Sequence, residues 1–160
     1  MNLSRFSLEG KVALVTGGSR GIGRASALAL ADAGAHVVVS SRKIADLEPV
    51  AEEIRAKGVK SLAIAAHNAK IEESKSLIER VVKEFGRIDI LMNNAGTNPY
   101  YGSLLEQDEK TYAVTMNVNL KGILFLSQLA AKIMKDQGGG SIINISSIGG
   151  LRAGDLGVYS

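Results

Sequence analysis

The sequence contains no cysteine, only two prolines, and aromatic residues make up only 4% of its 160 positions. Without cysteine it can form no disulfide, thiolate metal site or cysteine nucleophile, and we expect no metal site. No apolar run is long enough to span a membrane. The first ten residues are mixed and polar, unlike a signal peptide. We therefore expect a cytoplasmic protein without a membrane partner.

The sequence also lacks a strong excess of charge of either sign. The net charge is +3, from 19 basic and 16 acidic residues, and the basic residues are scattered. No basic run with interleaved aromatic residues appears, so nucleic acid is not an expected partner.

The length suits one domain, residues 1–160, that can bury a real core.

The most informative stretch joins an apolar run to a glycine-rich turn. Val12–Val15 predicts a strand, and Thr16 then leads into a turn with glycines at positions 17, 21 and 23. Glycines permit positive φ angles and let a pyrophosphate lie close to the backbone. After the turn the apolar spacing becomes helical, with one face formed by Ile22, Ala25, Ala29 and Ala33. A strand, a glycine turn and a helix together indicate a nucleotide-binding unit.

Short apolar runs and helical spacings then alternate along the chain. The runs predict strands at 12–15, 35–40, 61–66, 88–92 and 141–146. The spacings predict helices after Gly23, over 47–57, over 71–85 and over 108–137. This alternation indicates right-handed crossovers and a parallel sheet covered on both faces, which is a doubly wound α/β fold.

The turn Thr16-Gly17-x-x-x-Gly21-Ile22-Gly23 resembles the cofactor motif of the short-chain dehydrogenase/reductase family. Two further segments resemble family motifs at matching places: Asn93–Gly96 after the fourth strand, and Met116–Gly122 in the long helix. The resemblance implies a Rossmann-type fold and an enzyme that interconverts an alcohol and a ketone with NAD(P). It covers the amino-terminal two-thirds of a family domain. We therefore expect a dinucleotide-binding domain that is incomplete at its carboxyl end, before its last strands and helices.

The resemblance and the turn geometry assign a set of residues to the cofactor. These residues are Thr16, Gly17, Ser19, Arg20, Gly21, Ile22, Gly23, Ser41, Arg42, Asn94, Ala95 and Gly96. After the second strand, Ser41 and Arg42 stand where an NAD-binding fold usually has an acidic residue for the ribose 2′-hydroxyl. Arginine can instead pair with a 2′-phosphate, and Arg20 can reach the same group. The sequence therefore favours NADP over NAD.

One position departs from the family. His67-Asn68 aligns with an Asp-hydrophobic pair that lies near the adenine in the family. The departure leaves the adenine contact unassigned, and we give His67 no role.

By the same resemblance, the catalytic residues are Ser147, Tyr159 and Asn119. Tyr159 would pass a proton to or from the substrate oxygen, Ser147 would donate a hydrogen bond to it, and Asn119 would hold a relay water. The motif around the serine points to Ser147, whereas the spacing to Tyr159 points to Ser146. Asn117 is the neighbouring alternative to Asn119.

The expected partner is a small carbonyl or alcohol substrate. A 3-oxoacyl thioester, a sugar acid, a steroid and a small ketone all remain open. The run Ile123–Leu126 is apolar around the whole helix, which indicates either packing on the sheet or, as in the family, a subunit interface of a dimer or tetramer. The family's lysine would fall four positions after Tyr159, beyond Ser160. We therefore expect little or no activity from these 160 residues, and a cofactor-binding fragment without catalysis is the alternative function.

Overall fold

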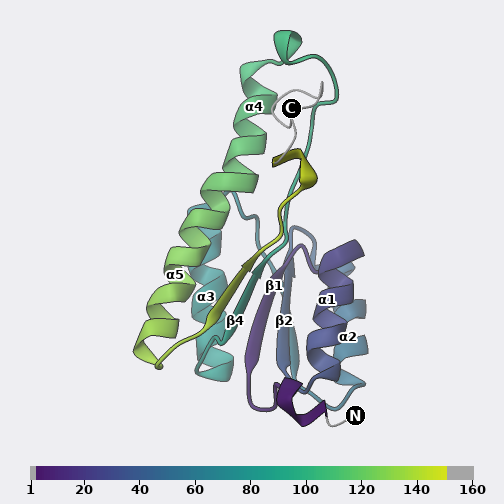
Figure 1. Ribbon diagram of the computed structural model, residues 1–160, viewed down its shortest axis with the longest axis vertical. Helices are drawn as coiled ribbons and strands as arrows, with labels where there is room; N and C mark the ends of the chain where they lie inside the picture. The colour runs from purple at the N-terminus through teal and green to yellow at the C-terminus, as the bar shows by residue number, and fades with distance from the viewer. Residues whose placement is uncertain (1–2, 151–160) are drawn as a thin grey trace.

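The computed structural model describes residues 3–150, which form one parallel sheet with helices on both faces (Figure 1). The strands are β1 (Val12–Thr16), β2 (His36–Ser41), β3 (Ser61–Ala65), β4 (Ile90–Asn93) and β5 (Ser141–Asn144). They lie in the order β3-β2-β1-β4-β5, and each neighbouring pair is parallel. The chain thus builds outward from β1 in both directions, which confirms the predicted doubly wound sheet.

The helices lie in two layers. The α-helices are α1 (Gly21–Asp32), α2 (Glu48–Arg55), α3 (Ile71–Phe85), α4 (Glu109–Met116) and α5 (Ile123–Asp136), with a π-helical segment, η4 (Asn117–Gly122), between the last two. Short 3₁₀ turns occupy Leu3–Phe6, Ile44–Asp46, Leu104–Glu106 and Ile148–Gly150. Helices α1 and α2 cover one face of the sheet, and α3 and α5 cover the other (Figure 1).

Both faces of the central strands are buried, which explains their continuous apolar runs. Val37, Val38 and Val39 are all fully buried, although successive side chains of a strand point to opposite faces. Some residues of the predicted runs are buried without belonging to a strand. Ile88 and Ala66 are examples, and for this reason the predicted ends of β3 and β4 differ from the observed ends by one or two residues.

Helix α1 does not bury the apolar face that the spacing predicted, which is formed by Ile22, Ala25, Ala29 and Ala33. Its buried residues are Gly23, Ala27 and Ala31, whereas Ile22 is 62% exposed. Small side chains let the helix axis approach the strands closely, and Ile22 is left to line the cleft described below. In contrast, the apolar face predicted for the next helix is buried as expected: Leu47, Val50, Ala51 and Ile54.

The predicted long helix over 108–137 is interrupted by η4. Asp108 caps α4 by accepting a hydrogen bond from the Thr111 backbone nitrogen at 2.7 Å. A Cβ on Gly122 would overlap the carbonyl oxygen of Asn68, so the wider π turn brings the helix backbone directly against the loop after β3. Single π turns within α-helices often lie at functional sites.

The apolar run after η4 is buried on one side only. Leu126 is fully buried against the sheet, whereas Leu124 is 51% and Phe125 36% exposed. Burial on more than one side is therefore not achieved within residues 3–150. In the same part of the chain, no helix is long and apolar enough to cross a membrane.

Candidate active site

A cleft of about 400 Å³ opens at the carboxyl ends of the strands. All the predicted cofactor-binding residues line it except Thr16 and Gly23. The other lining residues are Ala66, His67, Asn68, Thr97, Val114 and Val118. No aspartate or glutamate is among the lining residues, so the cleft suits an anionic ligand.

Thr16 and Asn94 hold the two central loops together beneath the cleft. The buried Thr16 hydroxyl accepts hydrogen bonds from the backbone nitrogens of Asn94 and Ala95, both at 3.1 Å, and donates to the Met92 carbonyl at 3.3 Å. The Asn94 Nδ2 donates to the carbonyls of Thr16 at 3.0 Å and Gly17 at 3.2 Å. Thr16 therefore shapes the site from below rather than lining it.

The three glycines of the turn serve two different purposes. A Cβ on Gly17 would lie 2.8 Å from Asn94 Nδ2, and one on Gly23 would overlap both that atom and the Gly17 carbonyl oxygen. These two glycines permit close packing within the protein. Gly21 has a φ of 56°, and a Cβ there would meet no atom within 4 Å, so its missing side chain leaves space in the cleft itself.

Helix α1 begins at this open space. Its N-cap residue, Arg20, makes no side-chain capping hydrogen bond. The unpaired backbone N–H groups of a first helical turn, with the positive end of the helix dipole, form a ready site for a phosphate. The residues around this helix end, Ser19–Ile22, all line the cleft.

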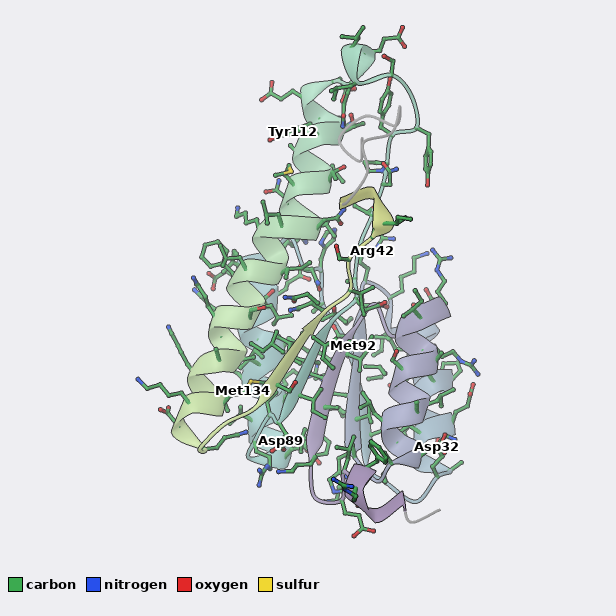
Figure 2. The ribbon with its side chains drawn as sticks, viewed as in Figure 1. Asp32, Arg42, Asp89, Met92, Tyr112 and Met134 are labelled. Carbon is green, nitrogen blue, oxygen red and sulfur yellow. The ribbon has the colours of Figure 1, made fainter. Side chains whose placement is uncertain are left out.

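Positive charge gathers beside the helix end. A neighbouring hollow of about 550 Å³ shares Arg20 and Arg42 with the cleft and adds Lys43, against one carboxylate, Asp46. Within residues 3–150, none of these three cations forms a salt bridge. Figure 2 shows Arg42 at the upper end of the sheet, where the strands end. Two arginines and a lysine without ion-pair partners suit a second anionic group beside the pyrophosphate.

The loop after β3 supplies two polar residues whose role the sequence left open. The His67 backbone nitrogen donates to a Glu73 carboxylate oxygen at 2.7 Å, and His67 Nδ1 accepts from the Ala69 nitrogen at 3.2 Å. Asn68 is only 7% exposed, and its Nδ2 is buried without a hydrogen-bond partner in the described chain. Asn68, which the sequence left without a role, lies three residues after the end of β3 and lines the cleft.

Asn119 is tied to the wall of the cleft by its side chain. Its Oδ1 accepts from the Thr97 backbone nitrogen and its Nδ2 donates to the Thr97 carbonyl, both at 2.8 Å. The π-helical segment η4 thus holds the loop after β4. This contact belongs to Asn119 and not to Asn117, the neighbour that the sequence offered as the alternative.

The two candidate serines follow the carboxyl end of β5, and both are exposed. The Ser147 hydroxyl accepts a hydrogen bond from the Gly149 nitrogen at 3.1 Å. The geometry of this segment does not discriminate between Ser146 and Ser147. Tyr159 lies outside the described residues.

A third hollow, of about 460 Å³, lies at the opposite end of the sheet. Asp89 is buried there and accepts hydrogen bonds from Arg87 at 2.6 and 2.8 Å, from the Val12 nitrogen at 2.9 Å and from Lys11 at 3.4 Å. Burial by itself would raise the pKa of this carboxyl. The hydrogen bonds from Arg87 and Val12, with the nearby positive charges, outweigh burial and hold the pKa of Asp89 below its ordinary value.

Comparison with known proteins decides the family. A family model described as short chain dehydrogenase matches residues 11–160. The chain belongs to the short-chain dehydrogenase family. The predicted resemblance to this family and the expected Rossmann-type fold are thereby confirmed.

Two curated relatives illustrate the range of this family. The chain is 45% identical over 157 residues to 2-dehydro-3-deoxy-D-gluconate 5-dehydrogenase of Escherichia coli K12, covering 95% of this chain and 61% of the relative. It is also 45% identical over 141 residues to a 3-oxoacyl-(acyl-carrier-protein) reductase of Staphylococcus epidermidis, covering 88% of this chain and 57% of that enzyme. The chain therefore spans about three-fifths of the length of these short-chain dehydrogenases.

Solved short-chain dehydrogenase structures have the same fold. A metagenomic short-chain oxidoreductase in complex with NADP superposes with a TM-score of 0.89 at 36% identity, over 95% of this chain and 69% of the other. A xylitol dehydrogenase with bound NAD⁺ superposes with a TM-score of 0.90 at 28% identity, over 94% of this chain and 58% of the other. The family thus uses either nicotinamide cofactor.

Proposed function

We propose that this short-chain dehydrogenase transfers a hydride between NADP(H) and an alcohol or ketone substrate. The observation that carries the proposal is the cleft at the carboxyl end of the sheet, with its open glycine at position 21 and two arginines without a carboxylate among its lining residues. The space left at Gly21 and the start of α1 fit a pyrophosphate. Arg20 and Arg42 fit the 2′-phosphate that distinguishes NADP from NAD.

When bound, the cofactor supplies the hydride, and the protein supplies positions and charges for the reaction. In the proposed mechanism Ser147 donates a hydrogen bond to the substrate oxygen. Tyr159 passes the proton to that oxygen during reduction and takes it back during oxidation. Asn119, through its two bonds to Thr97, keeps the loop after β4 against η4 and so positions the wall of the site.

The proposed substrate is a small carbonyl or alcohol compound. A 3-oxoacyl thioester and a sugar acid stand first, because relatives with 45% identity are named for substrates of these classes. A homo-oligomer and a cytoplasmic location remain predictions from the sequence.

The exposed edge of the sheet favours a second candidate, cofactor binding without turnover. Ile142 and Ile143 of β5 are 37% and 41% exposed although they point to opposite faces, and Ile145 is 36% exposed. Within residues 3–150 both faces of this edge strand are open, so these residues do not by themselves cover a substrate site beside β5. This candidate keeps the cleft and omits the catalytic roles.

One experiment separates these candidates. Binding of NADPH and NADH is measured by nicotinamide fluorescence for the 160-residue chain and for a chain that also carries any residues encoded after Ser160. NADPH oxidation by both chains is then followed with a 3-oxoacyl thioester, a keto sugar acid and small ketones. Tight NADPH binding with turnover of one substrate supports the oxidoreductase. NADPH binding without turnover supports the cofactor-binding candidate, and the absence of dinucleotide binding contradicts both.

A further inference from the structure

Gly122 ends the π-helical segment η4 and is buried, but it is not among the residues that line the cleft. Its backbone is ordinary right-handed helix, with φ −61° and ψ −44°, which a residue with a side chain adopts without strain. Glycine also destabilises a helix relative to alanine, because it loses more backbone entropy on folding. The reason for a glycine here therefore lies in its surroundings and not in its own conformation.

The surroundings of Gly122 leave no room for a side chain. A Cβ on this residue would overlap the carbonyl oxygen of Asn68, and it would lie 2.8 Å from the carbonyl carbon of Asn68 and 3.1 Å from the carbonyl oxygen of Asn117. All three are backbone atoms, which cannot turn aside as the end of a long side chain can. Since carbon atoms pack at about 3.5–4.0 Å, an added methyl group would push the two segments roughly 1 Å apart.

The segment that faces this glycine is the loop after β3, which forms part of the cleft wall. Residues 66–68 all line the cleft. The loop is anchored on its other side, because the Ala66 nitrogen donates to the Ser41 carbonyl at 2.8 Å and the His67 nitrogen donates to Glu73 at 2.7 Å. A closely packed and anchored loop transmits a push from behind to its lining residues.

The same π-helical segment also bears on a second loop of the cleft. Val118 lines the cleft, and the Asn119 side chain bonds both backbone groups of Thr97 at 2.8 Å. Gly122, three residues later, contacts the loop after β3. A side chain at Gly122 therefore moves the wall whichever side yields: either the loop after β3 shifts, or η4 shifts and takes Val118 and Asn119 with it.

We propose that Gly122 is a positioning residue for the cofactor. Because it carries no side chain, η4 lies directly against the loop after β3, and this contact fixes the wall of the cleft that the loop and η4 share. The inference rests on the proposed function, since it needs a dinucleotide in the cleft. It assigns no ligand contact to Gly122 itself.

The test compares Gly122→Ala, which adds one methyl group behind the wall, with Gly140→Ala as the matched control. A Cβ on Gly140 would also overlap a neighbour, Met134, but Gly140 lines the hollow at the opposite end of the sheet. NADPH affinity is measured by fluorescence titration, and urea unfolding establishes that each variant is folded. Hydrogen exchange followed by mass spectrometry reports separately on residues 66–70, on residues 94–98 and on the start of α1.

The expected result is a local loss. Gly122→Ala weakens NADPH binding about tenfold, the equivalent of about one lost hydrogen bond to the ligand. Hydrogen exchange becomes faster over residues 66–70 or, where η4 yields instead, over residues 94–98, and it is unchanged at the start of α1. Gly140→Ala leaves NADPH affinity within about twofold of wild type and the exchange of both loops unchanged.

Three outcomes overturn the inference. The first is a folded Gly122→Ala protein that binds NADPH as wild type does. The second is an equal loss of NADPH affinity in Gly122→Ala and Gly140→Ala, since only general destabilisation would then be at work. The third is weaker NADPH binding with unchanged hydrogen exchange in both loops.

A second variant covers the case in which Gly122→Ala does not fold. The Glu73 carboxylate bonds the His67 nitrogen and pairs with Lys70, so Glu73→Ala releases the loop after β3 and lets it make room for a methyl group. The double variant Gly122→Ala/Glu73→Ala is then compared with Glu73→Ala alone. NADPH binding about tenfold weaker in the double variant supports the inference, and equal affinity overturns it.

The failure of this inference differs from the failure of the proposed function. If wild type and Gly122→Ala bind NADPH equally well, the positioning role is wrong and the cofactor assignment stands. If wild type binds no dinucleotide, both are wrong.

Discussion

The two ends of the sheet carry hollows of similar volume, about 400 and 460 Å³, but use their polar groups in opposite ways. At the amino end, Asp89 is bonded by Arg87, Lys11 and a backbone nitrogen, and the Gln137 amide spans both backbone groups of Ile88. Figure 2 shows Asp89 low and Arg42 high on the same sheet. At the carboxyl end, Arg20 and Arg42 form no salt bridge and Asn68 Nδ2 has no acceptor within residues 3–150.

This difference indicates which hollow is a binding site. Polar groups that satisfy one another stabilise the fold and have little left for a ligand. Other polar groups are held in place by their neighbours and have donors or charges without partners in the described chain. Such groups are arranged to bind a ligand. The predictions below test whether the division between a structural end and a binding end is real.

The largest effect is expected from valine at Gly21 and Gly23. Gly21→Val fills the cleft, so NADPH binding falls on the order of a hundredfold or more, because several charge-assisted hydrogen bonds are lost. The free energy of unfolding of this variant falls by only about 1–2 kcal/mol, which is the cost of a left-handed backbone conformation for a residue with a Cβ. Gly23→Val overlaps Gly17 and Asn94 and costs about 3 kcal/mol or more of stability as well.

Fluorescence titration and urea unfolding of both variants check this pair. A folded Gly21→Val protein that binds NADPH as wild type does would show that the turn has no part in phosphate binding. Gly58→Val serves as the control, because Gly58 also has a positive φ and open space but lies far from the cleft lining.

The next effect concerns the choice of cofactor. Arg42→Asp is expected to weaken NADPH binding about ten- to a hundredfold, since a charge-assisted pair to phosphate is replaced by repulsion, and to leave NADH binding unchanged or stronger. Titration of both cofactors gives the ratio directly. Wild type that binds NADH at least as tightly as NADPH would contradict the assignment of NADP.

The structural end is tested by Asp89→Asn. The variant is expected to lose about 1–3 kcal/mol of unfolding free energy at pH 7, with NADPH binding unchanged. The pKa of Asp89 is lowered in the folded state. Its contribution to the free energy of unfolding is therefore fully present above the unfolded-state pKa and disappears as the pH falls through the folded-state pKa. The stability difference between wild type and variant should therefore shrink as the pH falls below the ordinary aspartate pKa of about 3.9.

Urea unfolding at pH 7, 5 and 3 measures this dependence. The effect should lie at the low end of the range, because Lys11 and Arg87 are nearly half exposed and solvent screens their charges. A difference that stays constant with pH, or a loss of NADPH binding, would remove the proposed division between the two ends.

The smallest effect is expected at the wall of the cleft. Asn119→Ala removes the two bonds to Thr97 and should weaken NADPH binding about threefold while costing about 1 kcal/mol of stability. Asn117→Ala, two residues earlier in the same π-helical segment, is the matched control and should leave NADPH affinity unchanged. Equal effects of the two variants would show that only the helix, and not the Asn119 side chain, supports the wall.

The sequence by itself determined the fold class, the family and most of the cleft. Continuous apolar runs that end in polar or glycine-rich loops are enough to predict a parallel sheet and the position of its binding cleft. A parallel sheet buries both faces of its strands and brings their carboxyl ends to one edge. The turn from Thr16 to Gly23 was found for this reason, whereas the segment from Asn93 to Gly96 was found through its resemblance to a family motif. The glycines and small residues of these segments set the local backbone geometry, which depends on neighbouring positions in the sequence.

Only the tertiary structure decided how single residues are used. The sequence could not tell that Gly23 packs within the protein whereas Gly21 leaves space for a ligand, since that depends on where Asn94 lies, more than seventy residues away. Nor could it tell that α1 buries Gly23, Ala27 and Ala31 and leaves Ile22 exposed. It also could not tell that Asn68 Nδ2 has no hydrogen-bond acceptor in the described chain. Such properties follow from contacts between distant segments, and no local pattern encodes them.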